Sequence, residues 1–149
     1  MKGKRRAANI VSMIFTFVMI IIIVSAKLSY YIPKFKSFGF DSRDAMSNLK
    51  FGITWTSISI LISLFPMIVL TLSNIFKLKD EKYKNESLIL LISSFLFLGL
   101  NILLELISCV GAAMTLSTAW GNIALEMIGY HFLSLSAMIP AVISVNRKE

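Results

Sequence analysis

Long uncharged, apolar runs constrain this chain more than any other feature. One run of 20 residues covers Ala7–Ala26, a second of 26 residues covers Phe51–Phe76, and a third stretch, Ser87–Asn146, holds 60 residues with two formal charges. A helix needs about 20 mostly apolar residues to cross a bilayer. The charged share of 15% is also below the roughly one quarter found in soluble domains. The sequence therefore predicts a membrane protein.

The spacing of these runs predicts four membrane-spanning helices. Sixty residues are too many for one span, and small and polar residues concentrate in Val110–Thr118, where we place a turn. Pro33 is expected to end the first helix, and an external loop is expected at 32–50. The expected fold is an all-α bundle of four transmembrane helices with short loops, in one integral membrane domain covering residues 1–149. Its helices are placed at residues 7–31, 51–76, 87–110 and 119–144.

The distribution of Lys and Arg predicts which ends face the cytoplasm. The N-terminal segment, the second loop and the C-terminal segment carry 4, 4 and 2 of these residues. The first loop carries 5, with Lys27 counted in it, and the third loop carries none. Because basic residues are retained on the cytoplasmic side, both termini are expected there. The predicted location is the cell membrane, as a multi-pass protein whose residue usage and short loops are typical of bacteria.

The basic net charge bears on the expected partners. A charge of +7 would suggest nucleic acid in a soluble protein. Here the basic residues lie between apolar runs, so the expected partner is the lipid bilayer with its anionic head groups, and no nucleic acid is expected. Another membrane protein, or a second copy of the chain as a homo-oligomer, is the expected protein partner. Three aromatic residues of the first loop either anchor it on the bilayer or form a partner-docking surface: Phe35, Phe38 and Phe40.

Two acidic residues inside the last apolar stretch are the main candidates for a functional site. Glu105 and Glu126 each occupy the fifth position of a repeated seven-residue string, 101–107 and 122–128, that starts with Asn101 or Asn122, so each Asn and Glu share one helix face. A hairpin that turns between residues 115 and 116 places both Glu residues at one depth. Two facing carboxylates in a low dielectric would share a proton or hold a cation. Tyr130, four residues after Glu126, could donate a hydrogen bond to its carboxylate.

A structural role is the alternative for these polar residues. A charged residue at the centre of a span costs at least about 2.5–3.5 kcal/mol, so the two Glu residues could instead be protonated or hydrogen-bonded and fix the packing of the last two helices. His131 does not share the face of Glu126, and contact with another helix or with the Ser134 region is expected for it. The hydroxyl stripe that includes Ser59 and Ser63 is expected to support close helix packing.

Motifs for catalysis and cofactor binding do not occur in the sequence, which has no nucleophile elbow, P-loop, zinc-binding HExxH or dinucleotide fingerprint. With one Cys and one His, we expect no metal, no cofactor and no enzyme. The four-span plan resembles claudin-like tetraspans and small multidrug transporters in outline, but it lacks the Cys pair of the former and the acidic residue that the latter carry in their first helix.

The sequence therefore favours a small non-enzymatic integral membrane protein. It would act as an auxiliary, regulatory or immunity-type subunit that binds another membrane protein. The alternative is a small oligomeric proton- or cation-coupled transporter or channel that uses the intramembrane pair of Glu105 and Glu126.

Overall fold

Four helices make up the part of the chain that the structure describes. The computed structural model describes residues 2–37, 45–79, 83–114 and 118–146. The helices are α1 (Lys2–Ser37), α2 (Ala45–Lys79), α3 (Lys84–Met114) and α4 (Thr118–Asn146). Each contains a segment long and apolar enough to cross a membrane. The predicted all-α fold with four such helices is confirmed.

The helices are longer than the uncharged runs that predicted them. The prediction that Pro33 ends the first helix is wrong, because α1 continues to Ser37. Proline removes one backbone hydrogen bond and can kink a helix without ending it. The expected external loop at 32–50 is also too long, since α2 already begins at Ala45. Of that loop, residues 38–44 lie outside the described residues, as do residues 115–117 of the expected third loop.

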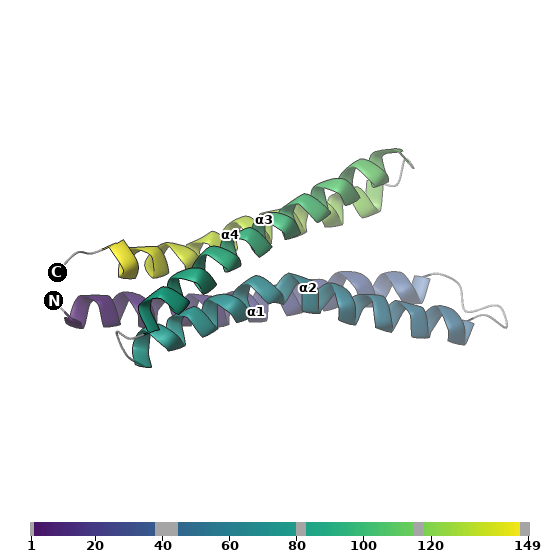
Figure 1. Ribbon diagram of the computed structural model, residues 1–149. Helices are drawn as coiled ribbons and strands as arrows, with labels where there is room; N and C mark the ends of the chain where they lie inside the picture. The colour runs from purple at the N-terminus through teal and green to yellow at the C-terminus, as the bar shows by residue number, and fades with distance from the viewer. Residues whose placement is uncertain (1, 38–44, 80–82, 115–117, 147–149) are drawn as a thin grey trace.

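The contacts between helices arrange the four helices as a ring. Helix α1 packs against α2 and α4, and α3 packs against the same two, so α1 and α3 stand diagonally opposite each other. Figure 1 shows that α1 begins and α4 ends at one end of the bundle, which we call the terminal end. Toward the other end, the α3–α4 hairpin tilts away from the α1–α2 hairpin (Figure 1). We call that end, where α1 and α3 finish, the splayed end.

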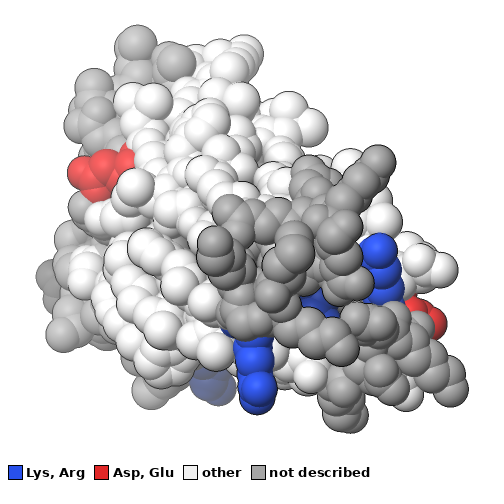
Figure 2. All heavy atoms as spheres, turned by 90° about the vertical axis from the view of Figure 1, so that its left-hand side faces the viewer, with Lys and Arg blue, Asp and Glu red and all other residues white. Residues whose placement is uncertain are grey.

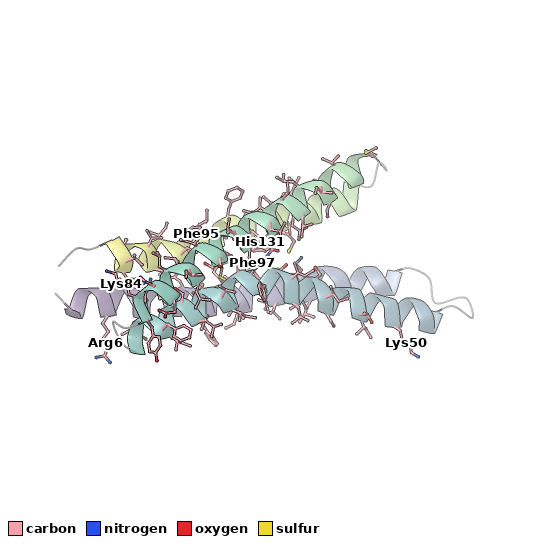
Figure 3. The ribbon with its side chains drawn as sticks, in the orientation of Figure 1. Arg6, Lys50, Lys84, Phe95, Phe97 and His131 are labelled. Atoms are coloured by element: carbon pink, nitrogen blue, oxygen red, sulfur yellow. The ribbon has the colours of Figure 1, made fainter. Side chains whose placement is uncertain are left out.

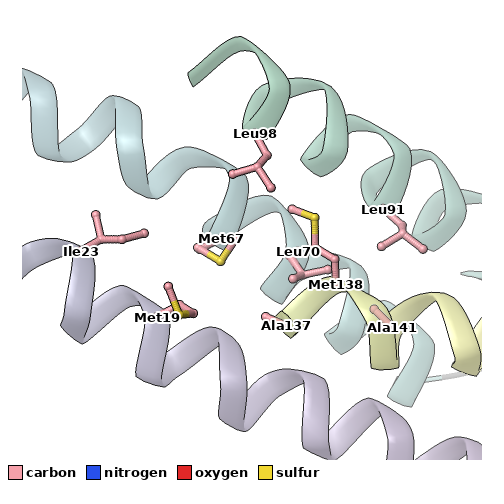
Figure 4. Close-up of a cluster of buried hydrophobic side chains, with 9 residues drawn as sticks. All are labelled: Met19, Ile23, Met67, Leu70, Leu91, Leu98, Ala137, Met138 and Ala141. Carbon is pink, nitrogen blue, oxygen red and sulfur yellow. The ribbon is translucent and has the colours of Figure 1, made fainter. Parts of the chain in front are cut away.

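Buried side chains recur along each helix every three or four residues, the spacing of a bundle seam. On α3 the buried stripe is Ser87, Leu91, Ser94, Leu98 and Asn101. The apolar part of the core gathers side chains from all four helices (Figure 4): Met19, Ile23, Met67, Leu70, Leu91, Leu98, Ala137, Met138 and Ala141. This core holds the two hairpins together between the two ends of the bundle.

The surface of the bundle is largely apolar, and its interior contains many polar side chains beside the apolar core. Large apolar side chains such as Phe17, Leu96 and Ile107 are more than half exposed, whereas Asn, Ser, Lys and His side chains are buried. A surface of this kind is stable in lipid, where apolar groups need no cover and polar groups need partners inside the bundle. At the terminal end, Figure 2 shows Lys and Arg side chains beside the uncharged surface. Arg6 and Lys84 lie near this end and Lys50 lies near the splayed end (Figure 3).

Candidate functional site

An ion pair crosses the interior of the bundle. The ammonium group of Lys27 on α1 donates hydrogen bonds to Glu105 Oε1 on α3 and to Ser59 Oγ on α2, each at 2.9 Å. The side chains of Lys27 and Glu105 are only 1% and 15% exposed. Since α1 and α3 stand diagonally opposite, this contact connects three helices through the middle of the ring. The charge of Glu105 is thereby neutralised inside the protein.

The fourth helix contributes a histidine to the same region. His131 on α4 is 1% exposed, and neither ring nitrogen has a hydrogen-bond partner among the described residues. Ala26, the neighbour of Lys27, packs against Met127 and Tyr130, which lie four residues and one residue before His131. Lys27 and His131 therefore occupy neighbouring levels of the α1–α4 interface. We call Lys27, Ser59, Glu105 and His131 the polar centre, to which each helix contributes one residue.

Asn101 shares the core-facing stripe with Glu105 but has a different partner. Its Nδ2 atom donates to the backbone oxygen of Ile62 on α2 at 3.1 Å, and the residue is 4% exposed. The sequence hypothesis placed this amide against the Glu105 carboxylate. In the structure, that carboxylate binds Lys27, and Asn101 fixes α3 against α2 one turn closer to the terminal end.

Glu126 does not join the polar centre. Its side chain is exposed and has no hydrogen-bond or ion-pair partner among the described residues. Tyr130 is half-buried and packs against Ala26 and Met127. Asn122 lies in α4, but its side chain is outside the described residues. The geometry therefore gives no support to a pair of facing carboxylates that share a proton.

The aromatic residues proposed for partner docking fall where the structure gives no side-chain description. Phe35 belongs to α1, with its side chain outside the described part, and Phe38 and Phe40 lie wholly outside it. The hypothesis that these residues dock a partner is not tested by the structure.

Lys27 is the residue of the centre that the sequence reasoning missed. It was counted with the first loop because it directly follows the uncharged run Ala7–Ala26. The signal that could have found it is its spacing, four residues after Ile23 and therefore on the same helix face. Ile23 is 1% exposed, so that face points into the bundle. A cation on that face can neutralise a carboxylate buried on another helix.

A second buried polar group, the inner cluster, lies closer to the terminal end. Asn9 Nδ2 donates to the backbone oxygen of Asn74 at 2.8 Å, and Asn74 Nδ2 donates to Ser12 Oγ at 2.9 Å. Ser12 Oγ donates in turn to the backbone oxygen of Ala137 at 2.7 Å. These bonds connect α1, α2 and α4. The inner cluster thus fixes the register of three helices, which is the packing role that short polar side chains serve in membranes.

Lys77 has a comparable structural role at the terminal end. Its Nζ atom donates to the backbone oxygen of Ala141 at 2.9 Å and to Ser144 Oγ at 3.0 Å. It thus satisfies a carbonyl group in the last turns of α4, where cations are favoured.

Comparison with known proteins adds no family to this geometry. No protein-family model, no curated protein and no solved structure matches the chain. Groups of three or more His, Cys, Asp or Glu residues that could hold a metal ion do not occur within the described ranges.

Proposed function

We propose that this chain is a small non-enzymatic auxiliary subunit that binds another membrane protein through its helix surface. The observation that carries the proposal is the exposed carboxylate of Glu126, which has no partner among the described residues. Glu126 lies eight residues into α4, about 12 Å along the helix. A lipid tail offers no hydrogen-bond donor or cation to a carboxylate, whereas a neighbouring protein can offer both.

The surroundings of Glu126 support contact with a helix. Gly129 is three residues further along and shares its face, and a methyl group added there would meet nothing within 4 Å. Leu133, on the same face, is 55% exposed. Small residues let the backbones of two membrane helices approach closely. We call Glu126, Gly129 and Leu133 the α4 outer face.

The same proposal includes the cell membrane as location, the bilayer as immediate partner and both termini in the cytoplasm. Lys27 is bound inside the bundle and no longer counts as a loop charge. The bias in Lys and Arg then becomes 10 on the side of the termini against 4 on the other side, because one of the five first-loop residues is removed. This larger bias favours the same orientation.

Photo-crosslinking in native membranes tests the auxiliary role. A photoreactive amino acid at Leu133 is expected to give a discrete protein adduct, and Glu126→Gln is expected to reduce its yield several-fold. The same amino acid at Phe17, which is 65% exposed on α1, serves as the matched control and is expected to react with lipid only. An adduct of twice the chain's mass would identify a second copy as the partner. Equal labelling at both sites, with no protein adduct, would contradict the proposal.

A proton- or cation-coupled transporter is the second candidate, and the buried charges of the polar centre favour it. In this case flux would depend on Glu105 and not on a pair of Glu residues. Proton flux into liposomes is expected to be lost in Glu105→Gln and retained in Glu126→Gln, because only Glu105 lies inside the bundle. Absence of flux in folded wild-type protein would exclude this candidate.

A further inference from the structure

We propose that the polar centre is a proton-binding site in which Glu105 exchanges Lys27 for protonated His131. The ligand is a proton delivered by water. A hydronium ion gives its proton to the free lone pair of the imidazole and leaves as water. The inference goes beyond the auxiliary role and does not depend on a membrane partner. Three observations carry it: the direction of the side chains, the unsatisfied ring of His131, and the charges that surround it.

The directions of the helices bring the side chains of Lys27, Glu105 and His131 closer together along the bundle axis. In an α-helix each side chain leans toward the N-terminus of its own helix. Lys27 and Glu105, on α1 and α3, therefore lean toward the terminal end, whereas His131 on the antiparallel α4 leans toward the splayed end. Ala26 packs against Met127 and Tyr130, which precede His131 on α4 and so lie on its splayed-end side. His131 lies between the two ends of the bundle (Figure 3).

The ring of His131 lacks the partners that a buried imidazole normally has. Both nitrogens are without a hydrogen bond in the described part of the chain, at 1% exposure. An unsatisfied buried polar group is costly and marks a place where water, an ion or a change of state supplies the partner. Histidine is the side chain whose unperturbed charge changes in the physiological pH range. A carboxylate that reaches the protonated ring would satisfy one of its N–H groups.

Among the described residues, Glu105 is the buried carboxylate that can stabilise the protonated form of His131. Lys27 on α1 is a cation and opposes it. From α2 the centre receives the hydroxyl of Ser59, which carries no charge. Helix α3 contributes Glu105 and, one turn further, the thiol of Cys109, and α4 contributes the half-buried phenol of Tyr130 and the exposed Glu126. Glu105 is the carboxylate that already lies at the centre.

Partner exchange would change how the hairpins are held. With His131 neutral, Glu105 and Lys27 connect α1 to α3 across the ring. With His131 protonated, Glu105 would bind α4, its neighbour in the same hairpin, and the diagonal link would be lost. Lys27 would keep its hydrogen bond to Ser59 Oγ, and water entering between the separated hairpins would hydrate its charge. The α3–α4 hairpin already tilts away from α1–α2 between His131 and the splayed end (Figure 3). Proton binding is therefore expected to widen the splayed end.

The single histidine of the chain makes this testable without ambiguity. The protein is labelled with ¹⁵N-histidine and placed in nanodiscs of phosphatidylcholine and phosphatidylglycerol, and the ring signals are followed between about pH 8 and about pH 4. In parallel, spin labels at Leu28→Cys and Ile107→Cys, in a Cys109→Ser background, report the distance from α1 to α3. We expect the ring to convert to imidazolium and the α1–α3 distance to lengthen over the same pH range.

Two variants separate partner exchange from general acid unfolding. In Glu105→Gln the distance is expected to stay constant with pH, and in Glu86→Gln, at an exposed carboxylate in the first turn of α3, both responses are expected to match wild type. If Glu105→Gln fails to fold, the proposal is tested by the wild-type protein alone, through its ring protonation and its α1–α3 distance. A ring that stays neutral throughout in helical, folded protein overturns the proposal, and so does a ring that protonates with no change in the distance.

Discussion

Lys27→Met is expected to destabilise the bundle by about 3 kcal/mol, the largest effect we expect from a single substitution. Removing one member of a buried ion pair typically costs about 3–5 kcal/mol, because the remaining charge stays buried without compensation. The lower end applies here, since the side chain of Glu105 is 15% exposed and part of its charge can still be hydrated. The measurement is the free energy of unfolding in mixed micelles titrated with sodium dodecyl sulfate.

The matched control removes both charges. In Lys27→Met/Glu105→Met neither charge remains, and a buried pair replaced by apolar residues of similar volume is often neutral. The double variant is therefore expected to unfold within about 1 kcal/mol of wild type and to be more stable than Lys27→Met alone. If the losses in free energy of unfolding instead add, the double variant will be the least stable. That result would contradict the stabilising ion pair between Lys27 and Glu105.

The four-helix fold could be predicted from the sequence because each helix is determined by a local run of apolar residues. A run such as Phe51–Phe76 has no stable alternative in lipid to a helix that satisfies its own backbone. The ends of the helices were harder to predict, since charges mark where a chain leaves the hydrocarbon but do not mark where a helix stops. Lys34 and Lys36 lie in α1, and Lys50 lies in α2, beyond the runs that predicted these helices.

The candidate functional site could be predicted only in part, because it depends on how each helix is rotated against its neighbours. Glu105 was found as a charge in an apolar stretch. The same reasoning paired it with Glu126, but the repeated Asn and Glu strings do not fix helix rotation. On α4 the buried line runs through Met127, His131 and Ser134. Glu126 lies one residue, or about 100°, away from Met127 and is exposed. That rotation results from the packing of all four helices.

The inner cluster gives the second large expected effect. Asn74→Leu is expected to lower the free energy of unfolding by about 1–2 kcal/mol. Asn74 is fully buried and its side chain donates to Ser12 Oγ at 2.9 Å. The substitution introduces an apolar side chain of similar size and removes the hydrogen-bond donor. Asn85→Leu is the matched control, since Asn85 is exposed on α3 and its replacement is expected to be near neutral.

A double-mutant cycle with Ser12→Ala assigns this loss to the hydrogen bond. Polar contacts between membrane helices have measured coupling energies that average about 0.6 kcal/mol and reach about 1.7 kcal/mol. We expect a value near the upper limit, because Ser12 is fully buried and also donates to the backbone oxygen of Ala137. Asn74→Leu and Ser12→Ala should therefore cost less together than the sum of their separate effects. Strict additivity would mean that the two residues stabilise the bundle independently, and that the inner cluster does not fix the register of α1 against α2.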